Sequence, residues 1–228
     1  MGSSEEHGGC TQRDARIQAL GQAYARAVLA GDEVAAEIAV REAIEADLTS
    51  AEIDEEIIAP ALWYVGELWE RGEISVADEH LATEISIRVL ALQREARRLQ
   101  RTRRATRVLL ATPSGEQHVV ALRMVSALLL EAGYDTLMLG PDVPAPAIAA
   151  SAERHGVDVI CLSDTVGSGD RILVSVHEIA QRVPGAAFVV GGRGITGRLQ
   201  ASPGIVVCRR VTDAVEAVDA LVKRADLN

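Results

Sequence analysis

The segment Glu116-Gln117-His118 places a carboxylate and an imidazole two residues apart, shortly after an apolar run. A neutral imidazole is a good ligand for a borderline transition metal. A carboxylate that accepts the other ring N–H fixes the tautomer and strengthens the donor nitrogen. The alternative is that His118 caps the helix that follows, and the spacing alone favours that alternative.

Two further clusters follow apolar runs, Ser163-Asp164-Thr165 and Gly191-Gly192. In an open parallel sheet, ligands bind beyond the carboxyl ends of the strands, so clusters at those ends meet in one crevice. The first apolar run is followed by neither GxGxxG nor GxxxxGK[ST], and GxSxG is absent. The sequence therefore argues against a Rossmann dinucleotide site, a P-loop phosphate site and the nucleophile site of a serine hydrolase.

The elements that would position these clusters are short runs rich in Val, Ile and Leu, separated by helical stretches. The runs are TRVLLAT, DTLML, VDVICLS, AAFVVGG and GIVVC, all after residue 105. Continuous apolar strands alternating with helices indicate a parallel sheet covered on both faces. We expect a flavodoxin-like, doubly wound (Rossmann-type) five-stranded sheet, in the order 2-1-3-4-5, over residues 107–228.

Residues 11–100 have apolar side chains spaced three and four apart, which predicts helices. Gly31-Asp32 and Arg71-Gly72 are expected breaks, and Pro60 predicts a kink or a late helix start. Capping boxes are expected at Thr49 with Glu52 and at Ser75 with Asp78. Short connections between the helices favour a four-helix bundle.

Residues 1–10 are interpreted as a disordered tail and residues 101–106 as an arginine-rich linker. The wider segment 94–107 contains seven arginines. We interpret this segment as the carboxyl end of a helix, where cations suit the helix dipole, followed by a solvated linker. The alternative is contact with a polyanion or a protein partner.

The composition narrows the function classes. The net charge of -10 argues against nonspecific binding to nucleic acid or to anionic lipid. We expect no membrane segment, because no apolar run approaches the roughly 18 residues that a span requires. The three cysteines are scattered without CxxC spacing, which favours a reduced, cytoplasmic setting.

Residues 106–225 resemble the cobalamin-binding domain family, which has D/ExHxxG after strand one, SxL or SxT after strand three, and GG after strand four. The resemblance implies that His118 is the lower axial ligand of cobalt and Glu116 its hydrogen-bond partner. It also implies that Ser163 donates to the base of the cofactor tail, and that glycines let the tail approach the backbone. Ala121 departs from the family, which has Gly there. The implied cofactor-binding positions are Glu116, Gln117, His118, Ser163, Thr165, Gly191 and Gly192.

The helical half is similar to the cap that covers the upper corrin face in this family. Trp69-x9-Glu79-His80 matches the motif of CarH- and LitR-type light sensors, in which these residues surround an upper ligand, usually 5′-deoxyadenosyl. The resemblance implies adenosylcobalamin bound between cap and α/β domain. From the residues alone, the alternatives are that Trp69 is a bundle-core residue and that Glu79-His80 is a solvated helix start. Glu70 departs from the sensors, which have His there.

The arrangement also resembles the photocobilins, which pair cobalamin with a bilin such as biliverdin. That likeness implies a non-covalent bilin in or near the helical half. The repressors of this type begin with a DNA-reading domain, and we expect none in this chain.

The favoured hypothesis is a light-responsive cobalamin sensor, not an enzyme, that changes its self-association or a contact with a protein partner. A homo-oligomer is expected, with a dimer favoured. The first alternative is a corrinoid methyl carrier that serves separate methyltransferases. The second is an interaction module with a degenerate site. Retention of the cofactor separates the last from the others, and the response to light separates the first two.

Overall fold

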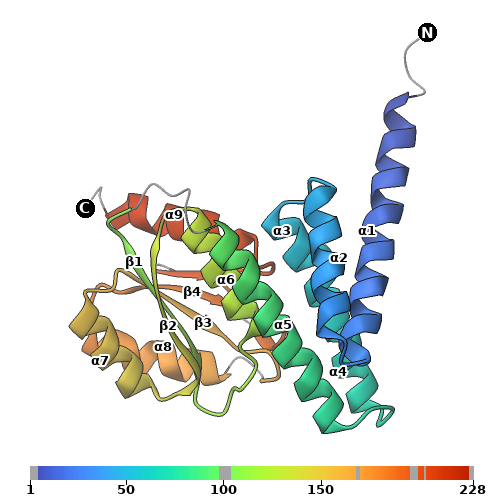
Figure 1. Cartoon of the computed structure of the whole chain (residues 1–228). Helices are drawn as coiled ribbons and strands as arrows, with labels where there is room; N and C mark the ends of the chain where they lie inside the picture. The colour runs from blue at the N-terminus through green and yellow to red at the C-terminus, as the bar shows by residue number, and fades with distance from the viewer. Residues whose placement is uncertain (1–4, 98–103, 168–169, 196–199, 203, 226–228) are drawn as a thin grey trace. The chain divides into compact units, whose positions relative to one another are not determined.

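The structure is a computed structural model that describes residues 5–97, 104–167, 170–195, 200–202 and 204–225. The chain forms two compact units, Met1–Gln93 and Arg94–Asn228. The first is helical and the second is α/β (Figure 1). The division falls before residue 100, where the sequence places the end of the bundle.

The helical unit has the four helical segments predicted from the sequence, within the part of the chain described. The third segment is one continuous rod made of two α-helical pieces joined by a π-helical turn, η1. The bounds are α1 Glu5–Leu29, α2 Glu33–Glu45, α3 Ser50–Ile53, η1 Asp54–Ile58, α4 Ala59–Glu70 and α5 Val76–Arg97.

The predicted helix starts are observed. Asp32 caps α2 by accepting from the amide of Ala35 at 3.0 Å. Thr49 and Glu52 form the reciprocal capping box of α3. Before α5, the Ser75 amide donates to the carboxylate of Asp78 at 2.9 Å, and the Asp78 amide donates to Ser75 Oγ at 3.3 Å. These bonds satisfy amides that the first turn of a helix leaves without partners.

Pro60 follows closely after the π turn, within a helical segment that already begins at Ser50, so the late start that the sequence allowed is not observed. A proline ring has no N–H to donate within a helix. The π turn immediately before it crosses α1 closely, because a Cβ on Gly21 would lie 3.3 Å from the carbonyl oxygen of Glu56. Glycine at position 21 thus permits the approach of the two backbones.

A buried hydrogen-bond chain links α1 to α5. Tyr24 is fully buried, and its hydroxyl donates to Ser86 Oγ at 2.9 Å. Ser86 in turn donates to the carbonyl of Ala82 at 2.8 Å. Burial raises the pKa of Tyr24 to about 12, so its phenol remains a neutral donor.

The α/β unit contains a five-stranded parallel sheet in the order β2-β1-β3-β4-β5, which confirms the predicted topology. Helices alternate with the first four strands, and a 3-10 turn, η3 (Arg193–Ile195), follows β4. The bounds are β1 Arg107–Pro113, α6 Val120–Glu131, β2 Asp135–Val143, α7 Ala145–His155, β3 Val159–Ser163, α8 Asp170–Arg182, β4 Ala187–Gly191, β5 Ile205–Val207 and α9 Asp213–Ala225.

The sheet is covered on both faces, with α7 and α8 on one and α6 and α9 on the other (Figure 1). Alternate strand residues point to opposite faces, so both sets must be apolar. Leu109 of β1, Ile160 of β3 and Phe188 of β4 belong to one core cluster with apolar side chains of α7 and α8. This packing explains the unbroken apolar runs in the sequence.

Two peripheral segments differ from expectation or lie partly outside the described residues. Helix α1 already begins at Glu5, whereas residues 1–10 were expected to form a tail; residues 1–4 lie outside the described part. Of the predicted linker 101–106, residues 101–103 lie outside the description.

Arg104 is fixed to the α/β unit just before β1. Its guanidinium contacts the hydroxyl of Tyr134 and the carboxylate of Asp219, and lies 4.5 Å from the centre of the Tyr134 ring. Its amide donates to the carbonyl of Gly133 at 2.8 Å. This end of the linker is therefore anchored. Every helix among the described residues is too short or too polar to cross a lipid bilayer.

Candidate functional site

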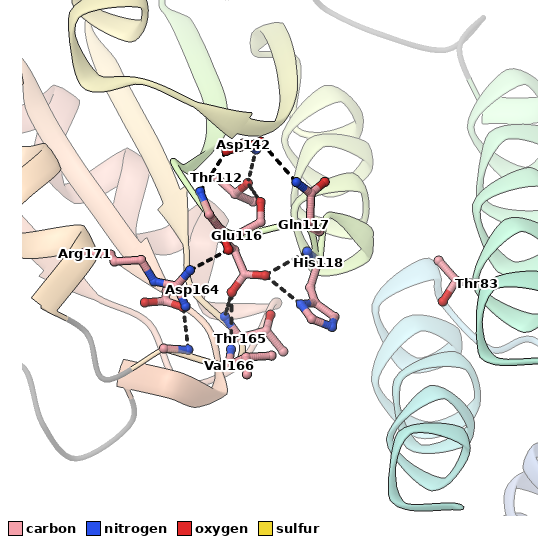
Figure 2. A network of polar contacts seen from close by, with 12 residues as sticks. Thr83, Thr112, Glu116, Gln117, His118, Asp142, Asp164, Thr165, Val166 and Arg171 are labelled. Atoms are coloured by element: carbon pink, nitrogen blue, oxygen red, sulfur yellow. Dashed lines mark hydrogen bonds and ion pairs between the residues drawn. The ribbon is translucent and has the colours of Figure 1, made fainter. Parts of the chain in front are cut away.

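The loops after β1, β3 and β4 meet at one edge of the sheet, as the sequence predicted (Figure 2). Glu116, after β1, accepts from the backbone amide of Thr165, after β3, at 2.7 Å. Asp164 donates its amide to the carbonyl of Gly191 at 3.0 Å and accepts from the amide of Gly194 at 3.1 Å. The three polar clusters are therefore hydrogen-bonded to each other.

Glu116 is the centre of this site. Its side chain is 1% exposed. One carboxylate oxygen accepts from the amide of His118 at 2.8 Å and lies 2.6 Å from the ring atom Nδ1 of His118. The other accepts from the amides of Thr165 at 2.7 Å and Val166 at 3.2 Å. Such charge-assisted bonds are strong, and together they hold the carboxylate in one orientation.

His118 is held by Glu116 through Nδ1, while 49% of its side chain is exposed. A carboxylate at Nδ1 favours the tautomer with its hydrogen on Nδ1, which leaves Nε2 as the nitrogen able to act as a donor to a metal. Helix α6 begins with Val119 at its cap and has no side-chain cap. The structure therefore gives no support to the alternative that His118 caps the helix.

The carboxyls of Glu116 and Asp164 form a coupled pair. Burial raises the pKa of Glu116, but hydrogen bonds from the His118 ring, the His118 amide and Asp164 outweigh it and hold that pKa well below its usual range. Burial and the neighbouring Glu116 carboxyl raise the pKa of Asp164. Glu116 thus carries the negative charge next to His118, while the pKa of Asp164 is shifted in the opposite direction.

Three further residues hold the loop that carries Glu116 and His118. Thr112 donates its hydroxyl to the carbonyl of Glu116 at 2.5 Å. Arg171 of α8 donates to the carbonyl of Gly115 at 2.6 Å, and Asp142 of β2 accepts from the amide of Gly115 at 2.7 Å. Sequence reasoning missed Asp142 and Arg171. The available signal for Asp142 was its place after Gly140-Pro141, a turn-forming pair at the end of a strand.

Ser163 has a polar atom without a partner. Its side chain is 3% exposed, and Oγ has no hydrogen-bond partner among the residues described. A buried hydroxyl left unpaired costs free energy, and such a group needs an explanation, of which a bound ligand is one. Thr165 takes part in the site through its backbone amide.

The two glycines after β4 have different surroundings. Gly192 has φ +113, and a Cβ there would lie 2.2 Å from the carbonyl oxygen of Asp164. At Gly191 the nearest atom would be the carbonyl oxygen of Cys208 at 3.5 Å, an ordinary contact. Gly192 is therefore required for the loops after β3 and β4 to approach each other.

The Trp69-x9-Glu79-His80 motif lies in the helical unit and flanks the turn between α4 and α5. Trp69 is 45% exposed, so it is not a bundle-core residue. Glu79 lies 2.6 Å from His80 Nδ1 and accepts from the hydroxyl of Thr83 at 3.0 Å. These groups are solvent-accessible and pair with near neighbours in sequence.

His118 is a single imidazole that is oriented by a buried carboxylate. No three His, Cys, Asp or Glu side chains gather as a metal site in the part of the chain that the structure describes. A single, oriented and exposed imidazole suits a metal carried in a macrocycle, which supplies the remaining donors itself. The unpaired hydroxyl of Ser163 at the same sheet edge fits a ligand that extends below the ring.

Comparison with known proteins identifies the family of this chain. Two family models, each described as a B12 binding domain, match residues 20–92 and 106–219. Trimethylamine corrinoid protein 2 of Methanosarcina acetivorans is 26% identical over 202 residues, which is 84% of this chain and 91% of that protein. The HTH-type transcriptional repressor CarA of Myxococcus xanthus is 35% identical over 130 residues, 56% of this chain and 44% of the repressor.

The structure of the monomethylamine corrinoid protein of Methanosarcina barkeri has the same fold. The TM-score is 0.67 at 16% identity, and the match covers 88% of this chain and 97% of that one. Because the two B12 binding domain models together span both units, this chain belongs to the B12-binding domain family and is a cobalamin-binding protein.

Proposed function

We propose that this protein is a light-responsive cobalamin sensor that binds the cofactor with His118 as the lower axial ligand of cobalt. The observation that carries the assignment of the site is the geometry of His118, whose Nδ1 lies 2.6 Å from a buried Glu116 carboxylate while the ring remains half exposed. Glu116 fixes the tautomer and increases the basicity of Nε2.

The site below the ring would hold the cofactor tail. The unpaired hydroxyl of Ser163 is suited to donate to the base of that tail, and Gly191 with Gly192 forms the adjoining wall. The Cβ of Ala121, where the family has Gly, adds a methyl group to this region. Gln117 and Thr165 complete the loops that border it.

The light response is proposed from the motif of the helical unit. Bound adenosylcobalamin supplies a cobalt–carbon bond that light breaks. Trp69 offers a flat, half-exposed apolar surface for the upper ligand, and Glu79 with His80 offers hydrogen-bonding groups for ribose hydroxyls. Loss of the upper ligand would remove contacts to these residues and so shift the equilibrium of self-association or of partner binding.

The helical unit also has room for a second chromophore. An open groove of about 560 Å³ lies between α1 and α4, next to the π turn. Arg26 offers a charge for a propionate, and Tyr64 offers an aromatic face, 46% exposed. A non-covalent bilin such as biliverdin is the proposed occupant.

A methyl carrier is the second candidate, and one observation favours it. The match to the trimethylamine corrinoid protein covers 91% of that protein, whereas the match to CarA covers 44% of the repressor. A carrier needs access to the upper face of the corrin, so Trp69 and Glu79 would then have no upper-ligand role. Light separates the two candidates, because only the sensor requires a change on illumination.

The test is an absorbance spectrum of the protein with adenosylcobalamin, with and without biliverdin, in the dark and after illumination, followed by gel filtration of each state. We expect corrin bands that co-elute with the protein and change with light together with its elution volume. Bound corrin whose photolysis leaves the elution volume of the protein unchanged would favour the methyl carrier, and a chain without bound corrin would contradict both. His118→Ala should abolish the spectral signature of axial nitrogen ligation.

The upper-ligand role of Trp69 has a matched control in Trp63, which is on the same helix and 49% exposed. We expect Trp69→Ala to weaken adenosylcobalamin binding or alter its photolysis, with an effect of about tenfold, while Trp63→Ala does neither. Titration by absorbance and photolysis kinetics measure both. Equal behaviour of the two variants would contradict the motif assignment.

A further inference from the structure

Asp142, near the end of β2, adopts a backbone conformation that side chains rarely take. Its φ is +56, and among the residues described only Asp47 shares such a value without being glycine. Aspartate tolerates this left-handed region better than most residues, but the conformation still costs free energy and tends to be retained where it serves a site. Figure 2 shows Asp142 beside the loop that carries Glu116 and His118.

The β2 strand is irregular where Asp142 occurs. Ala111 pairs with Gly140 and Pro113 pairs with Val143, with a shift of register on each side of Ala111. Extra residues on β2 thus face fewer residues on β1. Such bulges bend a strand and re-aim a side chain, often next to a functional site.

The side chain of Asp142 accepts two hydrogen bonds from the loop. One carboxylate oxygen of Asp142 accepts from the amide of Gly115 at 2.7 Å, and the other accepts from the side-chain amide of Gln117 at 3.1 Å. These contacts lie on both sides of Glu116. A carboxylate is a stronger acceptor than a neutral oxygen.

The backbone of Asp142 grips the same loop. Its amide donates to Thr112 Oγ1 at 2.9 Å and to the carbonyl of Glu116 at 3.0 Å. Residues 112–117 are thus held by one residue of the neighbouring strand through both its backbone and its side chain. His118 follows directly, so its position depends on this loop.

We propose that Asp142 is a positioning residue for His118, which fixes the Gly115–Gln117 loop in the ligating geometry before cobalamin arrives. Asp142 touches neither His118 nor the cobalt, and it acts through the loop. Pre-organisation of this kind raises affinity because the loop need not be ordered on binding. The inference rests on the proposed role of His118.

The test compares Asp142→Gly and Asp142→Asn with Asp47→Gly. Glycine adopts φ +56 without strain, so Asp142→Gly removes the two side-chain acceptors and leaves the backbone geometry accessible. Asp47→Gly makes the same backbone change at φ +59 in the helical unit. Asparagine can still accept from Gly115 but has no second oxygen for Gln117.

The first readout uses the cofactor-free chain. Hydrogen exchange of the Gly115 and His118 amides, measured by NMR, should be about tenfold faster in Asp142→Gly than in the wild type. Asp142→Asn should restore much of the protection at Gly115, and Asp47→Gly should not differ from the wild type. Unchanged exchange in Asp142→Gly would overturn the proposal.

The second readout uses cobalamin itself. In the EPR spectrum of bound cob(II)alamin, an axial imidazole splits the cobalt lines through its nitrogen. Asp142→Gly should reduce the fraction with this splitting and raise the Kd about tenfold, while Asp47→Gly keeps both. Full splitting and wild-type affinity in Asp142→Gly would overturn the proposal. If wild-type protein binds cobalamin without the splitting, the assignment of His118 fails, and faster exchange would still show that Asp142 orders the loop.

Discussion

The Glu116 site of the α/β unit and the Trp69–Glu79–His80 motif of the helical unit are built differently. The buried Glu116 carboxylate accepts hydrogen bonds from backbone amides of two loops, and the residues around it follow β1, β3 and β4. Trp69 and His80 are exposed, and Glu79 bonds only to near neighbours on its own helix in the contacts described above. The first arrangement holds its geometry without a ligand, whereas the second can change its contacts at little cost. A sensor requires both kinds of region.

The largest difference between the two units should be in the change of unfolding free energy when a glycine is replaced by alanine. Gly192→Ala would place a Cβ 2.2 Å from the carbonyl oxygen of Asp164 at φ +113, and we expect it to reduce the free energy of unfolding by about 4 kcal/mol. Gly66→Ala in α4 meets nothing within 4 Å and should stabilise by up to about 1 kcal/mol. Urea unfolding of the cofactor-free variants measures both. A Gly192→Ala variant as stable as the wild type would show that the loops can separate freely.

Removal of the two motif glutamates should give the next largest contrast. Glu116→Ala leaves three amides without their acceptor, so we expect a loss of about 3 kcal/mol in the free energy of unfolding. Glu79→Ala removes contacts at the surface and should change it by less than about 0.5 kcal/mol. Thermal and urea unfolding should agree on this order. Equal losses would mean that the Glu116 network is no more rigid than the helical motif.

The coupled carboxyls sharpen the comparison through pH. The pKa of Asp164 is raised in the folded state above 3.8, so its contribution to stability is complete below about pH 3.8 and is lost as pH rises towards the folded pKa. Asp164→Asn keeps a donor for Glu116 at every pH. The variant should therefore gain stability relative to the wild type as pH rises, by at most about 1.4 kcal/mol per pH unit.

Glu116 has the opposite sign. Its pKa is lowered in the folded state, so its stabilisation is present above the unfolded pKa of about 4.3 and is lost as pH falls towards the folded value. Urea unfolding of the wild type and Asp164→Asn from about pH 4 to about pH 7 resolves the Asp164 term. A difference in stability that does not vary with pH would show that Asp164 is ionised in the folded chain.

The sequence predicted the sheet order and the meeting of the three polar clusters, because both follow from apolar strands that must run parallel. It also predicted the caps at Thr49 and Ser75, since a capping box is a local pattern. The role of Asp142 was not predictable, because it depends on bulges in β2 that turn the side chain towards a loop 27 positions away in sequence. The opposite pKa shifts of Glu116 and Asp164 were not predictable for the same reason, because burial and proximity are properties of the fold.

The helical unit differed in a similar way. Residues 1–10 lack an apolar signal core and were expected to form a loose tail, but α1 already begins at Glu5. A proline in a helical pattern indicated a kink or a late start, whereas the structure continues the helix through a π turn just before Pro60. Local propensity does not show which neighbouring helix passes close by, and here Gly21 of α1 lies against that turn.

The contacts of Arg104 would resist a pulling force that is applied to the chain before β1. A pull that arrives through the residues preceding Arg104 meets a side chain bound to Tyr134 and Asp219 and an amide bound to Gly133. These bonds lie before Arg107, where β1 begins. A force on that connection would therefore load the bonds of Arg104 to Asp219, Tyr134 and Gly133 before it reached β1 and the Glu116 loop.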